Sequence, residues 1–390
     1  MVNIEPYVEV NDVERITQVS YGNAGKLAVI GAFPTKTFKL DVFTDLDACK
    51  NALLGDYKLP NDNSVENASK TVVPDTFVSF YCLDYVFMKN KQSGGAESVL
   101  IVNTNYGKNS LATSSTNADI NTACGLLADE DFDILNIAEP IAVAVQDNST
   151  YILNPIIRTL KTFSNNQYKN QKPFGIITGF DMANVTSALL TEFKTLWKDK
   201  GIFKAVTTPN RINGDANSLS IAQTGCWQAG FTAGRPVNKS ETMKVYDGII
   251  GESTKDVFTG SITTQNLLDA GFHTQKYKNR RDKVVQCISN ITPCDYDMKI
   301  ERIKNFMIKR LTLADRLGDD NDYITRDLLK GLFIAERERA IESRLLVDMD
   351  FNFINTDTDK VKAEVKFYIN DIIRVFILNV SLEITAYEED

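Results

Sequence analysis

The segment Gly22–Pro34, GNAGKLAVIGAFP, decides how the fold begins. It combines glycines, a lysine and an apolar run, as phosphate-binding loops do. The pattern G-x-x-x-x-G-K-[ST] is not met, because the position five before Gly25 is Ser20 and the residue after Lys26 is Leu27. The apolar run favours a strand, whereas the motif requires a helix there. The segment therefore predicts a turn that leads into a buried strand, and no nucleotide site.

Beyond this first strand, apolar strands alternate with helical segments as far as about residue 234. We expect strands at 27–33, 97–103, 131–140, 174–180 and 203–208, and helices at 44–54, 77–90, 118–130, 151–163, 183–199 and 218–234. Such alternation is typical of a largely parallel sheet with helices on its faces. The fold class is therefore α/β, and α+β over the whole chain.

After residue 236 the pattern changes. Short strands and a helix at 263–270 precede two long helices at 296–317 and 325–346, which are separated by the turn GDDND. This turn lacks the spacing of a calcium loop. We expect four parts, namely a linking arm at 1–22, an α/β domain at 23–236, a C-terminal α+β domain with both long helices at 237–355, and a strand arm at 356–390.

Both ends of the chain carry strand patterns. Near the start, Ile4, Val8 and Val10 lie on one side of an alternating pattern; near the end, Val361–Ile369 and Phe376–Ile384 alternate in the same way. The two C-terminal strands could pair as a hairpin within one molecule. Alternatively, terminal strands could add to the sheet of a neighbouring molecule, which generates rings or open helices when it is repeated.

The composition is that of a globular protein, with 43% hydrophobic and 24% charged residues. The net charge of −8 gives no reason to expect a nucleic-acid partner. The first residues lack the pattern of a signal peptide, and no apolar run is long enough to span a membrane. We therefore expect a protein that is made and folded in the cytoplasm.

Residues for catalysis or metal binding are scarce. The six cysteines are scattered without a CxxC motif, which predicts buried, reduced thiols, and the single histidine, His273, excludes a multi-histidine metal site. No metal, cofactor or catalytic residue is expected. The rival hypothesis is a cytosolic α/β enzyme or ligand-binding protein that uses the strand-end loops Thr178–Asp181 or Thr207–Asp215.

The helix expected at 296–317 has one apolar and one basic side. Its apolar stripe is an ordinary core pattern. The basic side is either a solvated face or a ridge that contacts an acidic partner, and it contains Lys299, Arg302, Lys309 and Arg316.

Several segments, taken in order, resemble one family. EPYVEVNDVERITQVS followed by GNAGKLAVIGAFP resembles the start of tail sheath proteins of contractile phage tails and related contractile injection systems. FVSFYCLDYVFMKNKQSGGAESVLIVN, DFDILNIAEP, CWQAGFTAGRPVNKSETMKVYDGIIG, LLDAGFHTQKYKNRRDKVVQCISNIT, GDDNDYITRDLLKGLF and VKAEVKFYINDIIRVFILNVSLEI are similar to later family segments. One departure is PVNKSETMKVYD, which stands where many sheaths have a Trp-x-Ala-Pro-Ala-like segment.

This resemblance implies a structural subunit without enzymatic activity. Such subunits polymerise helically around an inner tube and contract to drive the tube through a cell envelope. The implied partners are further copies of the chain, the inner tail tube protein, and the baseplate and tail terminator proteins, with no membrane insertion. Assembly would take place in the cytoplasm, before incorporation in a virion tail or a released particle; a phage and a bacteriocin-like machine both remain open.

The resemblance also implies a sheet shared between subunits, and it gives the basic ridge a role. To the shared sheet we assign Ile4, Val8, Val10, Val365, Phe367, Phe376, Leu378 and Val380. To the contact with the inner tube we assign Lys299, Arg302, Lys309 and Arg316.

Overall fold

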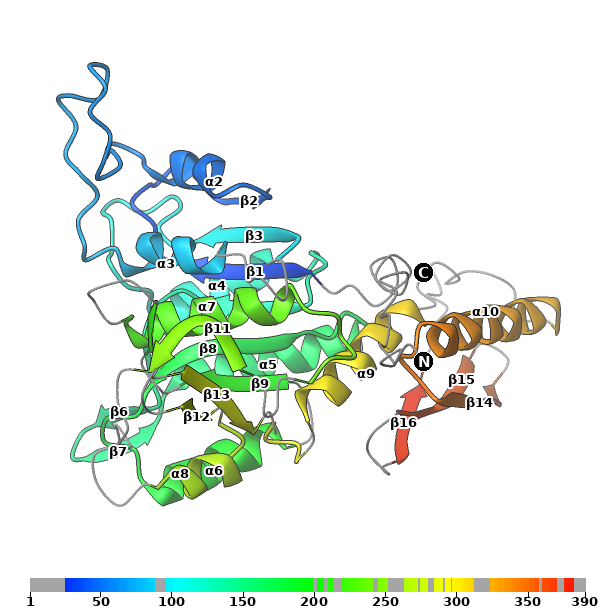
Figure 1. Cartoon of the computed structure of the whole chain (residues 1–390). Coiled ribbons are helices and arrows are strands. Elements are labelled where there is room, and N and C mark those ends of the chain that lie inside the picture. Colours follow the sequence, from blue (N-terminus) through cyan, green and yellow to red (C-terminus); the bar gives the residue numbers. More distant parts are fainter. Residues whose placement is uncertain are drawn as a thin grey trace, which may run out of the picture. The chain divides into compact units, whose positions relative to one another are not determined.

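The computed structural model describes residues 25–87, 96–198, 202–206, 210–212, 219–240, 245–251, 263–272, 274–279, 284–289, 292–295, 297–311, 323–357, 360–369 and 375–381 (Figure 1). The chain forms two compact units. The body comprises Ala24–Arg235 and Lys239–Lys309, and the C-terminal unit comprises Arg310–Asp390 with Met1–Asn23 and Pro236–Asn238. The sequence analysis predicted that both long helices belong to one domain, at 237–355. The two units divide them, because α9 (Met298–Arg310) belongs to the body up to Lys309 and α10 (Tyr323–Glu342) to the C-terminal unit.

The body is organised around a mixed sheet with the described strand order β2, β3, β1, β4, β8, in which β5 and β9 both pair with β8. β1 pairs in parallel with β3 and β4, β4 with β8, and β8 with β9, whereas β2 is an antiparallel edge strand. In chain order, the parallel strands β1, β3, β4, β8 and β9 lie in the sequence 2-1-3-4-5 of doubly wound folds. The largely parallel sheet is confirmed. Its strands are β1 Lys26–Gly31, β2 Leu40–Phe43, β3 Ser98–Asn103, β4 Ile134–Ile137, β5 Ile141–Ala142, β8 Gly175–Asp181 and β9 Ile202–Val206.

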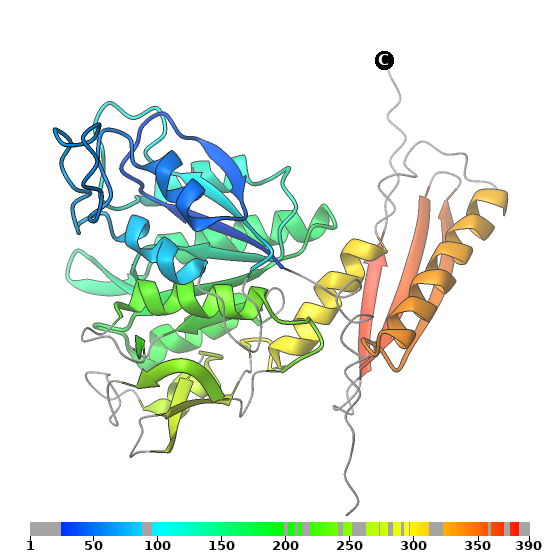
Figure 2. The same cartoon turned by 45° about the horizontal axis from the view of Figure 1, so that its top comes forward.

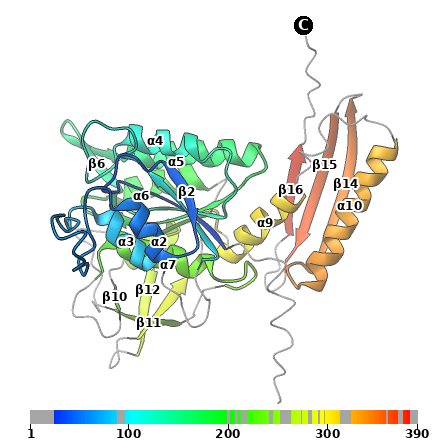
Figure 3. The ribbon, with the colours of Figure 1, turned by 90° about the horizontal axis from the view of Figure 1, so that it is seen from above.

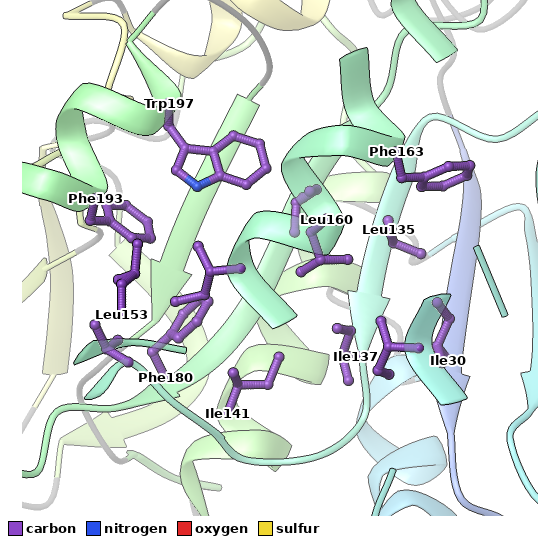
Figure 4. Packing of buried hydrophobic residues seen from close by; sticks show 14 of the residues in the cluster. Ile30, Leu135, Ile137, Ile141, Leu153, Leu160, Phe163, Phe180, Phe193 and Trp197 are labelled. Atoms are coloured by element: carbon purple, nitrogen blue, oxygen red, sulfur yellow. The ribbon is translucent and has the colours of Figure 1, made fainter. Parts of the chain in front are cut away.

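Helices cover both faces of this sheet (Figure 2; Figure 3). Along β1, Leu27 and Val29 enter the core that contains residues of α3 and α7, while Ala28 and Ile30 enter the core that contains residues of α4, α5 and α6. Figure 4 shows part of the second core. Burial on both faces explains why the strands read as continuous apolar runs. The helices are α2 Leu46–Leu53, α3 Val78–Val86, α4 Asn117–Leu126, α5 Pro155–Lys169, α6 Ser187–Trp197 and α7 Ile221–Ala233.

Capping residues set the ends of these helices. Thr116 and Asp119 form a reciprocal capping box at the start of α4. The helix expected at 151–163 begins later than predicted, at Pro155, with Asn154 as its N-cap. Proline at the first helical position is a normal start signal, since it has no N–H to satisfy. The preceding residues form instead a small hairpin of β6 (Ala144–Asp147) and β7 (Thr150–Leu153).

Helix α7 contacts the sheet through glycines. A Cβ atom built on Gly179 of β8 would lie 2.1 Å from the Ile221 carbonyl oxygen, and one built on Gly225 of α7 would lie 2.3 Å from the Gly179 nitrogen. Side chains cannot occupy these positions without moving backbone atoms. The contact therefore allows the helix and the strand to approach more closely than in an ordinary helix–sheet packing.

Two antiparallel sheets follow the doubly wound core. In the body, the described strands β10 (Asn210–Ile212), β11 (Val245–Gly251), β13 (Val284–Ser289) and β12 (Thr274–Asn279) are neighbours in that order, and α8 (Thr264–Asp269) precedes β12. In the C-terminal unit, β15 (Lys360–Tyr368) lies between β14 (Asp348–Asp357) and β16 (Val375–Ser381). The expected helix near 263–270 and the two expected C-terminal strands are confirmed.

Candidate functional site

The carboxyl edge of the parallel sheet is closed by Glu139. In doubly wound folds, ligands bind at this edge where the strand order reverses, which here is between β1 and β4. Glu139 follows β4 and is 5% exposed. Its Oε1 accepts hydrogen bonds from Ala32 N at 2.7 Å, Ser115 Oγ at 2.6 Å and Ser79 Oγ at 3.4 Å, and its Oε2 accepts one from Ser115 N at 2.6 Å. The usual ligand position is thus filled by a carboxylate of the protein itself.

We predict that Glu139→Gln lowers the free energy of unfolding by about 2–3 kcal/mol, because an amide N–H₂ would face donors that now bind a charged acceptor. Urea unfolding measures the change. The control is Glu192→Gln, whose exposed ion pair with Arg158 should be worth about 0.5 kcal/mol or less. Equal losses in the two variants would contradict the role assigned to Glu139.

Two asparagines hold the loops beside this edge. Asn103 accepts hydrogen bonds from Phe33 N at 3.1 Å and from Asn105 N at 3.0 Å, and donates to the Thr35 carbonyl at 2.8 Å. Asn105 donates to the carbonyls of Phe33 and Ala112 at 2.9 and 2.8 Å. The end of the GNAGKLAVIGAFP segment is therefore fixed by backbone-binding side chains, as expected of a turn and strand in a structural role.

The strand-end loops of the rival hypothesis offer little reactive chemistry. Thr178 donates to the Ile137 carbonyl at 3.0 Å, and Asp181 accepts from Ala183 N at 2.9 Å. Of the loop Thr207–Asp215, the structure describes only β10. Within the described chain there is no cluster of three His, Cys, Asp or Glu side chains that could hold a metal.

The described cysteines also lack the properties of reactive groups. Burial raises the pKa of Cys49 and of Cys124 to about 12, so these thiols are poor nucleophiles. No helix in the described ranges is long and apolar enough to cross a membrane. His273 lies outside the described residues.

The three-stranded sheet of the C-terminal unit is the other candidate site. Helix α10 packs on one face, where the ring of Phe333 lies 5.3 Å from that of Phe351 and 5.0 Å from that of Phe353. Val365 and Phe367 of β15 are fully buried. Tyr368 donates to Asp350 at 2.7 Å, and this bond ties β15 to β14. The sheet is thus a small, specifically packed element.

Its two outer strands each leave one edge unpaired among the described residues. β15 pairs with β14 from Asp348↔Tyr368 to Asp357↔Lys360, and with β16 from Tyr368↔Val375 to Lys362↔Ser381. The sequence analysis did not predict β14, although Met349, Phe351 and Phe353 alternate with polar residues in this strand. Open edges of this kind can accept a strand from another chain.

This sheet contains most of the residues assigned to strand exchange. Val365 and Phe367 lie on the central strand, paired on both sides within the chain, while Phe376, Leu378 and Val380 lie on β16 opposite Phe367, Val365 and Ala363. Ile4, Val8 and Val10 lie outside the described residues. Exchange between subunits therefore stays a prediction, and β14 and β16 are the strands with an edge for it.

Exposed apolar side chains concentrate on and just after α10. Leu329, Phe333 and Ala340 form its buried face. Of eleven exposed large hydrophobic side chains in the described chain, five lie in this one segment: Leu328 54%, Leu332 43%, Ile334 44%, Ile341 37% and Val347 52% exposed. Leu328 and Leu332 lie on one flank of the buried face of α10, and Ile334 and Ile341 lie on the opposite flank. Exposed apolar side chains of this kind mark protein–protein contact surfaces. The sequence analysis missed both flanks, although leucines at both 328 and 329 are more than one apolar stripe requires.

The four basic residues of the expected tube contact do not form one open face. Arg302 is 5% exposed and donates to the Arg235 carbonyl at 2.8 Å. Lys309 binds two aspartates, Lys299 is half-buried, and Arg316 lies outside the described residues. The apolar stripe of α9 is confirmed, since Ile300, Ile303, Met307 and Leu311 are buried. A contact of the basic residues with a tube stays a prediction.

Lys309 belongs to an ionic cluster at the amino edge of the sheet. Its Nζ lies 2.8 Å from Asp131, 3.1 Å from Asp133 and 2.6 Å from the Phe132 carbonyl oxygen. Lys26, at the start of β1, reaches the other oxygen of Asp131 at 3.2 Å. Burial raises the pKa of Asp131, but Lys309 and then Lys26 outweigh it, and the net pKa lies below the ordinary value. The cluster therefore joins the ends of α9 and β1 through one carboxylate.

We predict that Lys309→Met costs about 1–2 kcal/mol of stability at pH 7 and that this cost shrinks as the pH falls below about 4. Because its folded pKa is depressed, Asp131 contributes stability above its unfolded pKa and loses it as the pH falls through its folded pKa. Chemical unfolding at several pH values measures the difference between wild type and variant. In the control Lys36→Met, the side-chain bond lost within the described part of the chain is the one to the Asn109 carbonyl, and the difference should stay constant with pH. A pH-independent cost in Lys309→Met would overturn this account.

Comparison with solved structures places this fold. The chain is similar to a sheath tail protein of Desulfitobacterium hafniense (TM-score 0.61, 13% identity, 98% of this chain and 99% of that chain covered). It is also similar to a sheath tail protein of Listeria innocua (TM-score 0.62, 12% identity, 96% and 99% covered). A third similar structure is the helical sheath of the anti-feeding prophage in its contracted state (TM-score 0.53, 11% identity, 100% and 98% covered).

No protein-family model and no curated protein matches the sequence. The structural matches nevertheless extend over both units. The chain has the fold of sheath tail proteins, as the sequence resemblance implied.

Proposed function

We propose that this chain, which has the sheath tail protein fold, is the structural subunit of a contractile tail sheath. Copies of it would polymerise helically around an inner tube and then shorten, driving the tube through a target cell envelope. The observation that carries the proposal is the likeness to a subunit of a contracted helical sheath over 100% of this chain, the C-terminal unit included. Its role is structural and not catalytic, in line with the closed carboxyl edge of the sheet.

Subunits would be joined through the C-terminal sheet. Among the described residues, the outer edges of β14 and β16 have no strand partner, and the N-terminal arm at 1–22 has the alternating pattern of a strand. An arm that adds to a neighbour's sheet gains several hydrogen bonds, each worth about 0.5–1.5 kcal/mol net. Repetition of this head-to-tail contact without closure produces a helix, because different patches meet at each step.

The exposed side of α10 would supply a second contact between copies. Its leucines and isoleucines lie in the same unit as the open strand edges, so backbone pairing and apolar burial would act together. Further partners would be the inner tail tube protein, and the baseplate and tail terminator proteins at the two ends. Assembly would occur in the cytoplasm of the producing cell, and the product would be a virion tail or a released particle.

Negative-stain electron microscopy of the purified chain tests this proposal. We expect ribbed hollow cylinders or stacked rings, either from the chain alone or after addition of a candidate tube protein. Deletion of residues 1–21 or of 371–390 should abolish these assemblies, while the body of the truncated chain still unfolds cooperatively.

Two results would count against the proposal. A chain that stays monomeric beside its tube protein would remove the sheath assignment. Cylinders that form unchanged after both deletions would leave the assignment intact but exclude strand exchange through the chain ends.

A further inference from the structure

Two cysteine thiols meet inside the body, between α3 and α7. Cys82 of α3 and Cys226 of α7 are both fully buried. The side chains of Cys82 and Cys226 belong to the same buried core cluster and lie close enough to influence each other electrostatically, and Cys226 Sγ donates to Asn136 Oδ1 at 3.0 Å. Asn136 in turn donates to the Ile177 carbonyl at 2.8 Å. Cys226 is thus tied to the sheet by a hydrogen-bond chain, and Cys82 lies beside it in the same core.

The backbones of α3 and α7 approach closely at this place. A Cβ atom built on Gly230 of α7 would lie 2.4 Å from the Val86 carbonyl oxygen of α3. Cys226 and Cys82 each lie four residues, about one turn, before Gly230 and Val86. On both helices, the cysteine therefore lies one turn before the residue that makes the closest contact. The cysteine pair is thus next to the point where the two helices approach most closely. Disulfides need Cα atoms within about 4.4–6.8 Å, and a helix pair brought together by glycine favours such a separation.

We infer that Cys82 and Cys226 are a modification site, a latent disulfide that joins α3 to α7 when a small-molecule disulfide supplies the oxidising equivalents. One cysteine thiolate attacks the disulfide RSSR, which gives a mixed disulfide and one RSH. The second cysteine thiolate then attacks the protein sulfur of that mixed disulfide and releases the second RSH. Two thiols and one RSSR thus become one protein disulfide and two RSH, with protons and electrons balanced.

Burial controls when this reaction can happen. It raises the pKa of the Cys82 thiol well above the ordinary value, so little thiolate exists in the folded body. Oxidation of the thiols is therefore slow in the native state. It is fast during folding or unfolding, when α3 and α7 are not packed together and the thiols are accessible. Once formed, the bond is shielded from reductants by the same packing. It closes a loop that contains β3, β4, β8 and β9, and such a long loop strongly limits the unfolded chain.

Peptide mapping of the full chain tests the inference independently of sheath assembly. The chain is refolded in a buffer of reduced and oxidised glutathione, blocked with N-ethylmaleimide, digested and analysed by mass spectrometry. We expect the Cys82–Cys226 peptide to exceed any other cystine peptide by about tenfold, and the oxidised chain to unfold at a temperature roughly 5–10 °C higher. Random pairing among the six cysteines, or an unchanged or lower unfolding temperature, would overturn the inference.

Two variants serve as controls. Cys226→Ser keeps a donor for Asn136 but removes the partner sulfur, so its oxidised and reduced forms should melt alike. Cys124→Ser leaves the pair intact and should keep the full difference between the two forms. A redox-dependent shift that persists in Cys226→Ser would refute the pairing. If that variant does not fold, the peptide map of the wild-type chain still decides.

Discussion

We expect Leu332→Asp to abolish the proposed self-assembly of the chain and to change its thermal unfolding little. Leu332 and Leu328 lie one turn apart on α10, and both are substantially exposed in the single chain. A charge there should cost little in the monomer, because 43% of Leu332 is exposed and a carboxylate can reach water. In an interface the same carboxylate would be desolvated without a partner, which costs several kcal/mol per contact, and the contact recurs at every subunit.

Sedimentation and electron microscopy of Leu332→Asp measure the loss, with thermal unfolding as the test of folding. Ile334→Asp examines the opposite flank of α10 and should impair assembly through the same mechanism. Ile152→Asp is the matched control, since Ile152 is a comparably exposed residue on the β6–β7 hairpin and should not matter. Normal cylinders from both α10 variants would show that this surface is not a contact between subunits.

Gly225→Ala lowers the free energy of unfolding by about 3–5 kcal/mol, the second large effect that we expect. The added methyl would lie 2.3 Å from the Gly179 nitrogen, so backbone atoms of α7 and β8 must separate. Overpacking typically costs about 1–3 kcal/mol, and the cost is larger here because backbone atoms, not flexible side-chain ends, must move. Because α7 is buried on nearly all sides, it cannot relax by tilting towards solvent.

The matched control is Gly125→Ala in α4. No atom lies within 4 Å of a Cβ built there, so the substitution should stabilise the helix by about 0.5–1 kcal/mol. Urea unfolding of the two variants separates close packing from helix propensity. If Gly225→Ala were as stable as Gly125→Ala, the glycine contact would not be what positions α7.

The core of the fold follows from local sequence signals. LAVIGAF, ESVLIVN and FGIITGF are apolar runs of strand length, and residues such as Thr116 and Thr186 mark the helix starts with their side chains. The predicted start of the helix at residue 151 is four residues too early, because the sequence YIL is as compatible with a helix as with a strand. The signal that should have decided is the pair Asn154–Pro155.

The candidate contact surfaces were harder to predict, because they depend on which apolar side chains remain uncovered. The sequence of α10 shows more leucine and isoleucine than one stripe can bury, but only the packing of Phe333 on Phe351 and Phe353 shows which face is covered. Strand β14 was missed because aspartate and asparagine, which are uncommon in strands, occupy its polar positions. Likewise, the sequence left the basic side of α9 open as a solvated face or a partner contact, and only the structure shows that Arg302 is buried and donates to the distant Arg235 carbonyl.

The ionic cluster at Asp131 has a mechanical meaning. Lys26 and Lys309 lie where the chain enters and leaves the body, and both hold the same carboxylate. Arg302, on the same helix as Lys309, holds the carbonyl of Arg235, where the chain leaves the body a further time. A pulling force on any of these connections would therefore act on α9 and on the amino edge of the sheet near Asp131.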